Sequence, residues 1–151
     1  MKLSTRSRYG ARLLLDMAQH HQKGPVQIGD IAKRQNISVK YLEQLIIPLK
    51  KARIVKSVRG TKGGHYLAKP PEQVSIGEIV ALLEGSETIL ACTDHPESCE
   101  RADICLTRQV WKEAQEAMYA KLNSISLADL IKKGESIGGS DHSEETEGQP
   151  S

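Results

Sequence analysis

The sequence from Gln27 to Leu67 reads QIGDIAKRQNISVKYLEQLIIPLKKARIVKSVRGTKGGHYL, and it predicts a helix, a tight turn, a second helix and a hairpin. Ser38 follows the turn and is a typical N-cap for the second helix. The apolar residues behind it have the i, i+3, i+4, i+7 spacing of a helix packed on a core: Leu42, Leu45, Ile46 and Leu49. Two β-rich runs, 54–59 and 65–68, then flank a glycine-rich tip, which predicts a hairpin.

This order of elements is the layout of a winged helix-turn-helix, a motif that reads duplex DNA. Pro48 lies inside the second helix of the motif. Because a proline nitrogen cannot donate to the carbonyl of Gln44, we expect a bend or an early end of the helix there.

Positive charge is concentrated in the same part of the chain. Residues 1–69 carry 15 Lys and Arg against three acidic residues, a net charge of +12, whereas 70–133 and 134–151 each carry −5. A solvated basic surface without a partner is the alternative interpretation. The overlap of the charge with the helix-turn-helix pattern favours a surface that binds a polyanion.

The polar face of the second helix supplies the candidates for base reading: Lys40, Tyr41, Glu43 and Gln44. Gln44 is the best of them, because an amide can both donate to and accept from adenine in the major groove. Lys40 suits guanine or a phosphate, Tyr41 a sugar or phosphate, and Glu43 cytosine. Each of these side chains could equally be an ordinary solvated helix position.

The hairpin and the first helix supply candidates for the groove and backbone. Arg59 at the wing tip suits a narrow minor groove, whose negative potential attracts guanidinium. Ser4 can cap a first helix, so that basic side chains near its start could hold a phosphate. The predicted phosphate contacts are Arg6, Arg8, Lys56 and Lys62.

The remaining chain divides by composition. With 1–69 as the winged helix-turn-helix domain, 70–91 form a linker and supporting helix, and 92–105 lack periodicity and are expected to form a loop. Residues 106–133 predict a long helix and a short last helix, and 134–151 predict a disordered acidic tail. The fold class is therefore mainly α with a small β-hairpin wing.

The long helix, beginning near Ile104, has an apolar strip that includes Val110 and Met118 and carries the only tryptophan, Trp111. Because it lies outside the predicted DNA-binding domain, we interpret it as a dimerisation helix. The alternative is a helix that packs back on its own domain.

All three cysteines, Cys92, Cys99 and Cys105, fall within 14 residues. Three soft thiolates on a flexible segment suit an iron–sulfur cluster or zinc, and we favour the cluster. The cysteine set lacks a fourth ligand, for which His95 is a candidate. A thiol switch and a loop without metal are the alternatives.

Other function classes find little support. The sequence contains no apolar run long enough to cross a bilayer and no signal-peptide pattern at its start, so we expect a cytoplasmic protein that does not contact membranes. It shows no convincing Ser/His/Asp or paired-carboxylate arrangement, so we do not expect an enzyme. A small iron–sulfur electron carrier is an alternative of a different class.

Over residues 1–133 the chain resembles the IscR/NsrR/CymR group of bacterial transcription regulators, the Rrf-two family. The matching motifs are Tyr41-Leu42-Glu43-Gln44-Leu45, Val58-Arg59-Gly60, Cys105-Leu106-Thr107 and Leu122-Asn123-Ser124-Ile125-Ser126-Leu127. The resemblance implies a homodimer on a dyad-symmetric operator, with the long helix crossing to the partner subunit. It implies DNA contacts by Tyr41, Glu43, Gln44 and Arg59, and an iron–sulfur cluster on the three cysteines, for which we favour 2Fe–2S over 4Fe–4S.

The chain departs from that pattern in several places, among them a gap between the first two cysteines that is one residue longer and His65 where an aromatic is common. Arg108 stands where IscR-like members have a histidine, and it cannot ligate iron. Arg8 stands where NsrR-like members can use a carboxylate, and Arg53 where glycine is common.

Together these observations predict a cluster-sensing transcription regulator, with repression favoured. The alternative within the same group is a metal-free regulator controlled by a partner protein or a thiol metabolite.

Overall fold

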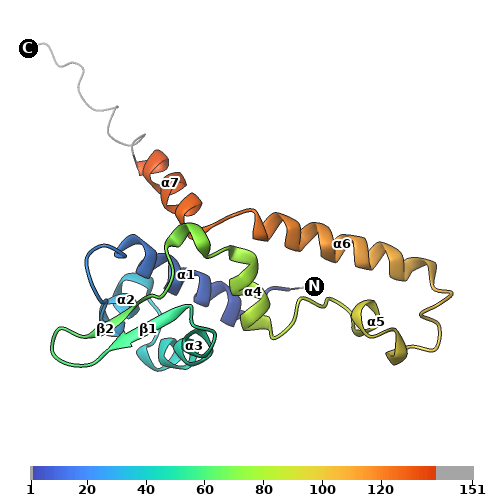
Figure 1. Cartoon of the computed structure of the whole chain (residues 1–151), viewed down its shortest axis with the longest axis horizontal. Coiled ribbons are helices and arrows are strands. Elements are labelled where there is room, and N and C mark those ends of the chain that lie inside the picture. The colour runs from blue at the N-terminus through green and yellow to red at the C-terminus, as the bar shows by residue number, and fades with distance from the viewer. Residues whose placement is uncertain (1, 139–151) are drawn as a thin grey trace, which may run out of the picture.

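The computed structural model describes residues 2–138 (Figure 1). The elements in chain order are α1 (Thr5–Gln19), α2 (Ile28–Gln35), α3 (Val39–Lys51), β1 (Val55–Val58), β2 (Gly64–Leu67), η1 (Pro71–Gln73), α4 (Ile76–Glu84), α5 (Ala91–Asp94), η2 (Pro96–Ser98), α6 (Leu106–Asn123) and α7 (Leu127–Gly138). The predicted fold class is confirmed, since the described part of the chain is mostly helical with one two-stranded hairpin.

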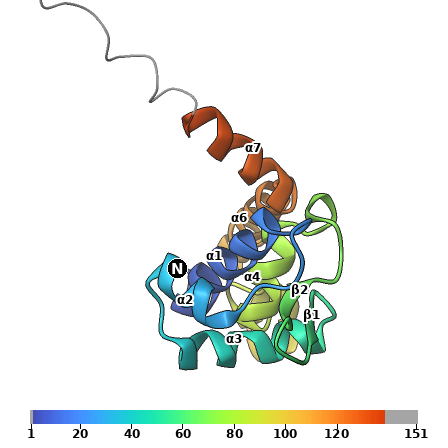
Figure 2. The same ribbon diagram turned by 90° about the vertical axis from the view of Figure 1, so that its left-hand side faces the viewer.

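An aliphatic core joins the first four α-helices and the start of α7. Figure 2 shows α1 and α4 in the middle of the domain, with α3 running across below them. The side chains that are at most 2% exposed include Leu13, Leu14 and Met17 of α1, Leu42, Leu45 and Leu49 of α3, Ile79 of α4 and Leu127 of α7. The stripe predicted for α3 therefore packs inward, which turns its polar face outward.

Both predicted serine caps are present. The Oγ of Ser4 accepts from the amide of Ser7 at 3.2 Å, and the Oγ of Ser38 accepts from the amide of Tyr41 at 3.1 Å. Each cap satisfies one of the amides that the first turn of a helix leaves unpaired.

The wing is an antiparallel hairpin in which Val55 pairs with Leu67 and Val58 with Gly64. Val26 adds to it by exchanging two 2.8 Å hydrogen bonds with His65. Gly64 has φ +148°, and a Cβ there would press on the backbone of Val26. Glycine is therefore required where the segment before α2 meets the wing.

The early end expected at Pro48 is wrong, because α3 continues to Lys51. Pro48 lies in the last turn, so the missing donor affects only the bond to Gln44, and the proline carbonyl still accepts from Ala52 at 2.9 Å. After the helix, Arg53 adopts φ +59°, a left-handed conformation that glycine would tolerate more easily.

Two boundaries also differ from the predictions. The cysteine segment is not a plain loop, since α5 and η2 lie within it. The last helix runs to Gly138 rather than Lys133. Ser126 and Asp129 cap its start reciprocally, with N···O distances of 2.9 and 3.1 Å. A single interior glycine, Gly134, costs only about 1 kcal/mol and does not stop it. The rest of the predicted tail, 139–151, lies outside the described residues.

Helix α6 extends away from the domain, with α5 beside its first half (Figure 1). The first half of its predicted apolar strip is uncovered, with Val110 54% and Trp111 46% exposed, and the nearby Leu106 is 88% exposed. Within residues 2–138, none of the helices combines the length and hydropathy needed to span a membrane.

Candidate nucleic-acid interface and cysteine segment

The outer face of α3 presents three of the four predicted base-reading side chains to solvent. Lys40, Glu43 and Gln44 are exposed. Tyr41 is half-buried, with its ring edge-on to Tyr9 of α1 at a centroid distance of 5.7 Å and an interplanar angle of 89°. Tyr41 is therefore partly a packing residue that fixes α3 against α1, whereas the other three are free to contact a ligand.

The start of α1 lies next to this face. Arg6 lines one small recess together with Tyr41, Gln44 and Leu45. Arg8 is exposed and donates to Thr5 Oγ1 at 3.3 Å. The two arginines thus sit at the capped N-terminus of α1, where backbone amides also favour an anion.

The wing presents its cations in the same exposed manner. Lys56, Arg59 and Lys62 are all exposed, and the tip is closed by a 3.0 Å bond from the Gly63 amide to the Gly60 carbonyl. Burial, together with the nearby Lys50 charge, lowers the pKa of His65. The histidine is therefore neutral at pH 7, and the charge of the wing comes from its lysines and arginine.

A buried carboxylate fixes α2 on α1. Asp16 is 1% exposed and accepts from Arg34 Nη2 at 2.7 Å, Arg34 Nε at 2.9 Å and Gln35 Nε2 at 3.0 Å. Burial alone would raise the pKa of Asp16, but the hydrogen bonds from Arg34 and Gln35 and the Arg34 charge outweigh it, so the pKa is lowered. The ion pair holds the helix-turn-helix in place.

Sequence reasoning missed this pair. The signal was an acidic residue, Asp16, inside the buried face that also contains Leu13 and Met17. Arg12 also serves this joint: its guanidinium lies 5.4 Å from the centre of the Tyr9 ring and donates to the backbone carbonyl of Gln35. Arg12 thus joins α1 to α2, whereas Arg8 donates to Thr5 of its own helix.

The three cysteines are free thiols in different settings. Cys92 is half-buried on α5, Cys99 is exposed after η2, and Cys105 is the half-buried N-cap residue of α6. A hydrogen bond with Thr107, whose Oγ1 lies 3.3 Å from the sulfur, and the backbone amide of Arg108 lower the pKa of Cys105. Thiolate character at Cys105 suits it as a ligand for a soft metal.

The predicted ligand set is not gathered at one point. Within residues 2–138, no three Cys, His, Asp or Glu side chains are placed to hold a metal ion. His95 is exposed, and its Nδ1 lies 3.1 Å from Glu97 Oε1. Three free thiols, one with a depressed pKa, fit an iron–sulfur cluster in their chemistry, and holding one requires the segment between α5 and α6 to rearrange.

Residues 3–133 match the Rrf2 family model, whose description is "Iron-dependent Transcriptional regulator". The chain belongs to the Rrf2 family. It is 51% identical over 132 residues to Protein rrf2 of Nitratidesulfovibrio vulgaris, covering 87% of this chain and 88% of that protein. It is 39% identical to the HTH-type transcriptional regulator IscR of Serratia proteamaculans, covering 87% of this chain and 79% of that protein.

Two solved structures have the same fold. T. potens IscR matches with a TM-score of 0.77 and 38% identity, covering 98% of this chain and 94% of that chain. CymR, the global cysteine regulator of B. subtilis, matches with a TM-score of 0.73 and 35% identity, covering 88% of this chain and 98% of that chain. This member of the Rrf2 family is therefore a DNA-binding transcriptional regulator and belongs to a non-enzyme family. The sequence predictions of a DNA-binding regulator and of a non-enzyme are confirmed.

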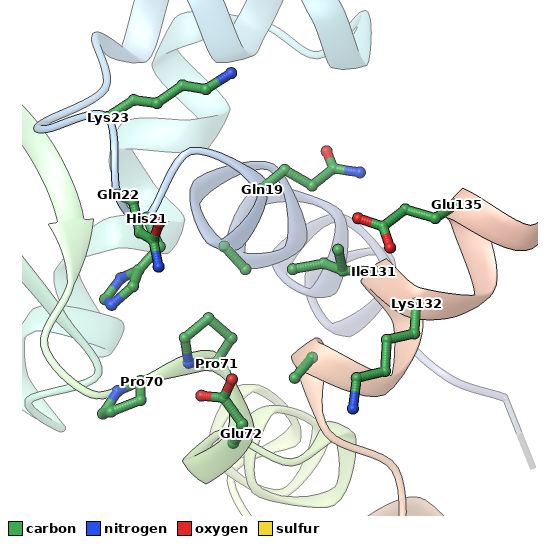
Figure 3. A pocket seen from close by; sticks show the side chains of 12 residues that line it. Gln19, His21, Gln22, Lys23, Pro70, Pro71, Glu72, Ile131, Lys132 and Glu135 are labelled. Carbon is green, nitrogen blue, oxygen red and sulfur yellow. The ribbon is translucent and has the colours of Figure 1, made fainter. Parts of the chain in front are cut away.

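A separate recess of about 570 Å³ lies between the end of α1, η1 and α7 (Figure 3). Charged side chains of both signs line it, among them Glu72, Lys132 and Glu135. Nδ1 of His21 is buried there without a hydrogen-bond partner among the described residues. None of the lining residues belongs to α3, the wing tip or the cysteine segment.

We expect Asp16→Asn to destabilise this Rrf2 protein by about 2 kcal/mol, because Arg34 loses its bidentate partner but is 39% exposed and stays partly solvated. The lowered pKa means that the stabilisation by Asp16 is present at neutral pH and is lost as the pH falls below about 4. Urea unfolding at pH 7 and at pH 3 to 4 measures both effects, and the variant should lack this acid-dependent part. Asp103→Asn, at an exposed position of the cysteine segment, is the control. Equal losses in both variants would contradict the assigned role of Asp16.

Proposed function

We propose that this Rrf2 protein is a homodimeric repressor that binds a dyad-symmetric operator with α3 in the major groove and the wing against the minor groove. The observation that carries the proposal is the uncovered polar face of α3, with Lys40, Glu43 and Gln44 exposed beside an exposed basic wing. The family description, a transcriptional regulator, supports it.

In this proposal each exposed side chain has a distinct task. Gln44 reads adenine with its amide, and Lys40 and Glu43 contact neighbouring base edges or phosphates. Arg59 enters the minor groove, and Lys56, Lys62, Arg6 and Arg8 contact phosphates, which sets the register on the duplex. Two copies related by a twofold axis place their half-sites about one helical turn apart.

The proposed dimer forms through α6. An apolar recess lined by Ile89, Leu90, Trp111 and Ala114 lies against this helix. Exposed apolar side chains gathered on one protruding helix favour burial against a second copy.

We further propose that Cys92, Cys99 and Cys105 hold an iron–sulfur cluster, with 2Fe–2S favoured over 4Fe–4S and His95 as a candidate fourth ligand. When bound, a cluster supplies a redox-active centre and a tie between α5, η2 and the start of α6. The chain's own part is to present thiolates: Cys105 has a depressed pKa, and Cys99 is exposed and able to move. The cysteine segment is joined to α6, so its conformation with or without a cluster changes the relative position of the two DNA-binding domains.

A metal-free regulator controlled by a metabolite or a partner protein is the second candidate. The recess between α1, η1 and α7 is the observation that favours it, because it is large enough for a small polar molecule. An electron carrier finds no support among the relatives, which are regulators of transcription.

We expect Gln44→Ala and Lys56→Ala to weaken DNA binding in different ways. Gln44→Ala should lose about 10-fold on duplexes selected from a random pool by the wild-type protein, and little on unselected DNA, because a base contact discriminates by roughly 1–3 kcal/mol. Lys56→Ala should weaken binding to all duplexes. It should also reduce the slope of log K against log salt concentration by the amount expected for about one phosphate contact per subunit. Gel shifts at several salt concentrations measure both. If the two variants behave alike, Gln44 does not read bases.

Trp111→Glu should convert the dimer to monomers at micromolar concentration, because it places a charge in the apolar strip of α6. Ala120→Glu is the matched control, since residue 120 is exposed on the opposite side of the same helix. Analytical ultracentrifugation gives the masses. A dimer that survives Trp111→Glu, or a wild-type monomer, would exclude α6 as the interface.

Anaerobically purified protein should be brown and contain about two iron atoms and as much sulfide per chain. Cys99→Ser should lose the iron and the visible absorbance because one of three thiolates is removed, whereas Ser98→Ala, at the exposed neighbouring position, should keep both. Iron and sulfide analysis with absorption spectra measures this. Colourless, iron-free wild-type protein would favour the metal-free candidate.

A further inference from the structure

Arg108 binds the backbone of the cysteine segment. Its Nε donates to the carbonyl oxygen of Cys92 at 2.6 Å, and its Nη2 approaches the carbonyl oxygen of Thr93 at 3.3 Å. Both carbonyls belong to the four-residue helix α5, which is too short to satisfy them internally.

Gln115 forms a second attachment seven residues further along α6. Its Oε1 accepts from the amide of Ile89 at 2.7 Å and lies 3.3 Å from Thr93 Oγ1, and its Nε2 lies 3.4 Å from Asp94 Oδ1. Thr93 is 4% exposed and Gln115 8%. Polar groups this well buried hold a fixed geometry when their hydrogen bonds are made.

We call these attachments the α5–α6 clamp. They fix the positions of two of the three cysteines and not the third. Cys105 begins α6, the helix that carries the clamp, and Cys92 lies on α5, the helix that it holds. The position of Cys92 relative to Cys105 is therefore set by protein contacts alone. Cys99 lies outside the clamp, and its backbone bonds are short-range, to Pro96 at 3.2 Å and from Ala102 at 3.1 Å.

We propose that Arg108 is a positioning residue that holds α5 on α6 in the metal-free protein. Cys92 then stays docked and slow to react, and rearrangement of the segment is confined to residues 95–104, with Cys99 as the moving thiol. Arg108 thus links α6 to α5 through hydrogen bonds. A metal-ligating side chain at the same position would instead link them through the metal. The role of Arg108 in sensing rests on the proposed function. Its role in holding α5 on α6 in the metal-free protein does not.

The test uses the full-length protein after chelation and reduction, labelled with iodoacetamide and followed at each cysteine by mass spectrometry. In the wild type, the exposed Cys99 should react much faster than Cys92. Arg108→Ala should raise the labelling rate of Cys92 about 10-fold and speed amide exchange over residues 89–94, with Cys99 unchanged. Arg108→Lys, which keeps the charge but loses the two-pronged geometry, should restore only part of the protection.

Gln109→Ala is the matched control, because Gln109 is the exposed neighbour on α6 and bonds Glu113 of the same helix at 2.8 Å. Thr93→Val is a milder second variant, which removes hydroxyl contacts within the clamp at nearly constant volume and should also raise Cys92 reactivity. A folded Arg108→Ala protein with wild-type Cys92 labelling and exchange would overturn the proposal. Because no iron is present, that failure is distinct from failure to find a cluster in the wild type.

Discussion

The ion pair between Asp16 and Arg34 is the constraint on which the placement of the DNA-binding surface depends. An unpaired buried carboxylate is expensive, so arrangements of α2 on α1 that separate Arg34 from Asp16 are disfavoured. Helix α3 follows α2 after a short turn and packs its leucines into the same core. The ion pair thus orients α2 on α1. The aliphatic contacts are less directional, and they stabilise the packing of the helices against one another.

The same joint decides which cations remain available to DNA. Arg12 donates to the backbone carbonyl of Gln35, and Arg34 donates to the carboxylate of Asp16, so both form hydrogen bonds within the domain. Exposed cations lie at the start of α1, on α3 and on the wing, among them Arg6, Arg8, Lys40, Lys56, Arg59 and Lys62, and others such as Lys33, Lys50 and Lys51 are exposed on the same half of the chain. The large positive charge of the N-terminal half therefore includes a part used in packing and a larger part exposed to solvent.

The features that could be predicted from the sequence are those carried by short-range patterns. Ser38, the leucine stripe of α3 and the tip glycines Gly60 and Gly63 each act within a few residues, so their spacing was sufficient. The contact of Gly64 with Val26 is long-range and could not be predicted in this way. The Asp16–Arg34 pair spans 18 residues and gives no periodic signal. Helix α3 runs through Pro48 because the proline lies in its last turn, and α7 continues past Gly134, with residues 132–138 exposed, because one glycine costs only about 1 kcal/mol. Arg108 could be recognised as a poor ligand, but its partners on α5 could not be inferred.

The contacts of α6 limit how a change at the cysteines can act. At its far end, Ser75 Oγ lies 3.3 Å from Asn123 Oδ1, and a Cβ on Gly77 would collide with Asn123, so α4 and α6 meet closely. Glu84 at the end of α4 accepts from the Ser4 amide at 2.9 Å, which ties α4 to the start of α1. Within one chain, α6 therefore joins the domain near its C-terminal end through α4, whereas its first half extends beyond the domain with α5 beside it (Figure 1). In a dimer joined through α6, a change in the cysteine segment would act on the helix that joins the two copies, and so on the spacing of the two α3 helices.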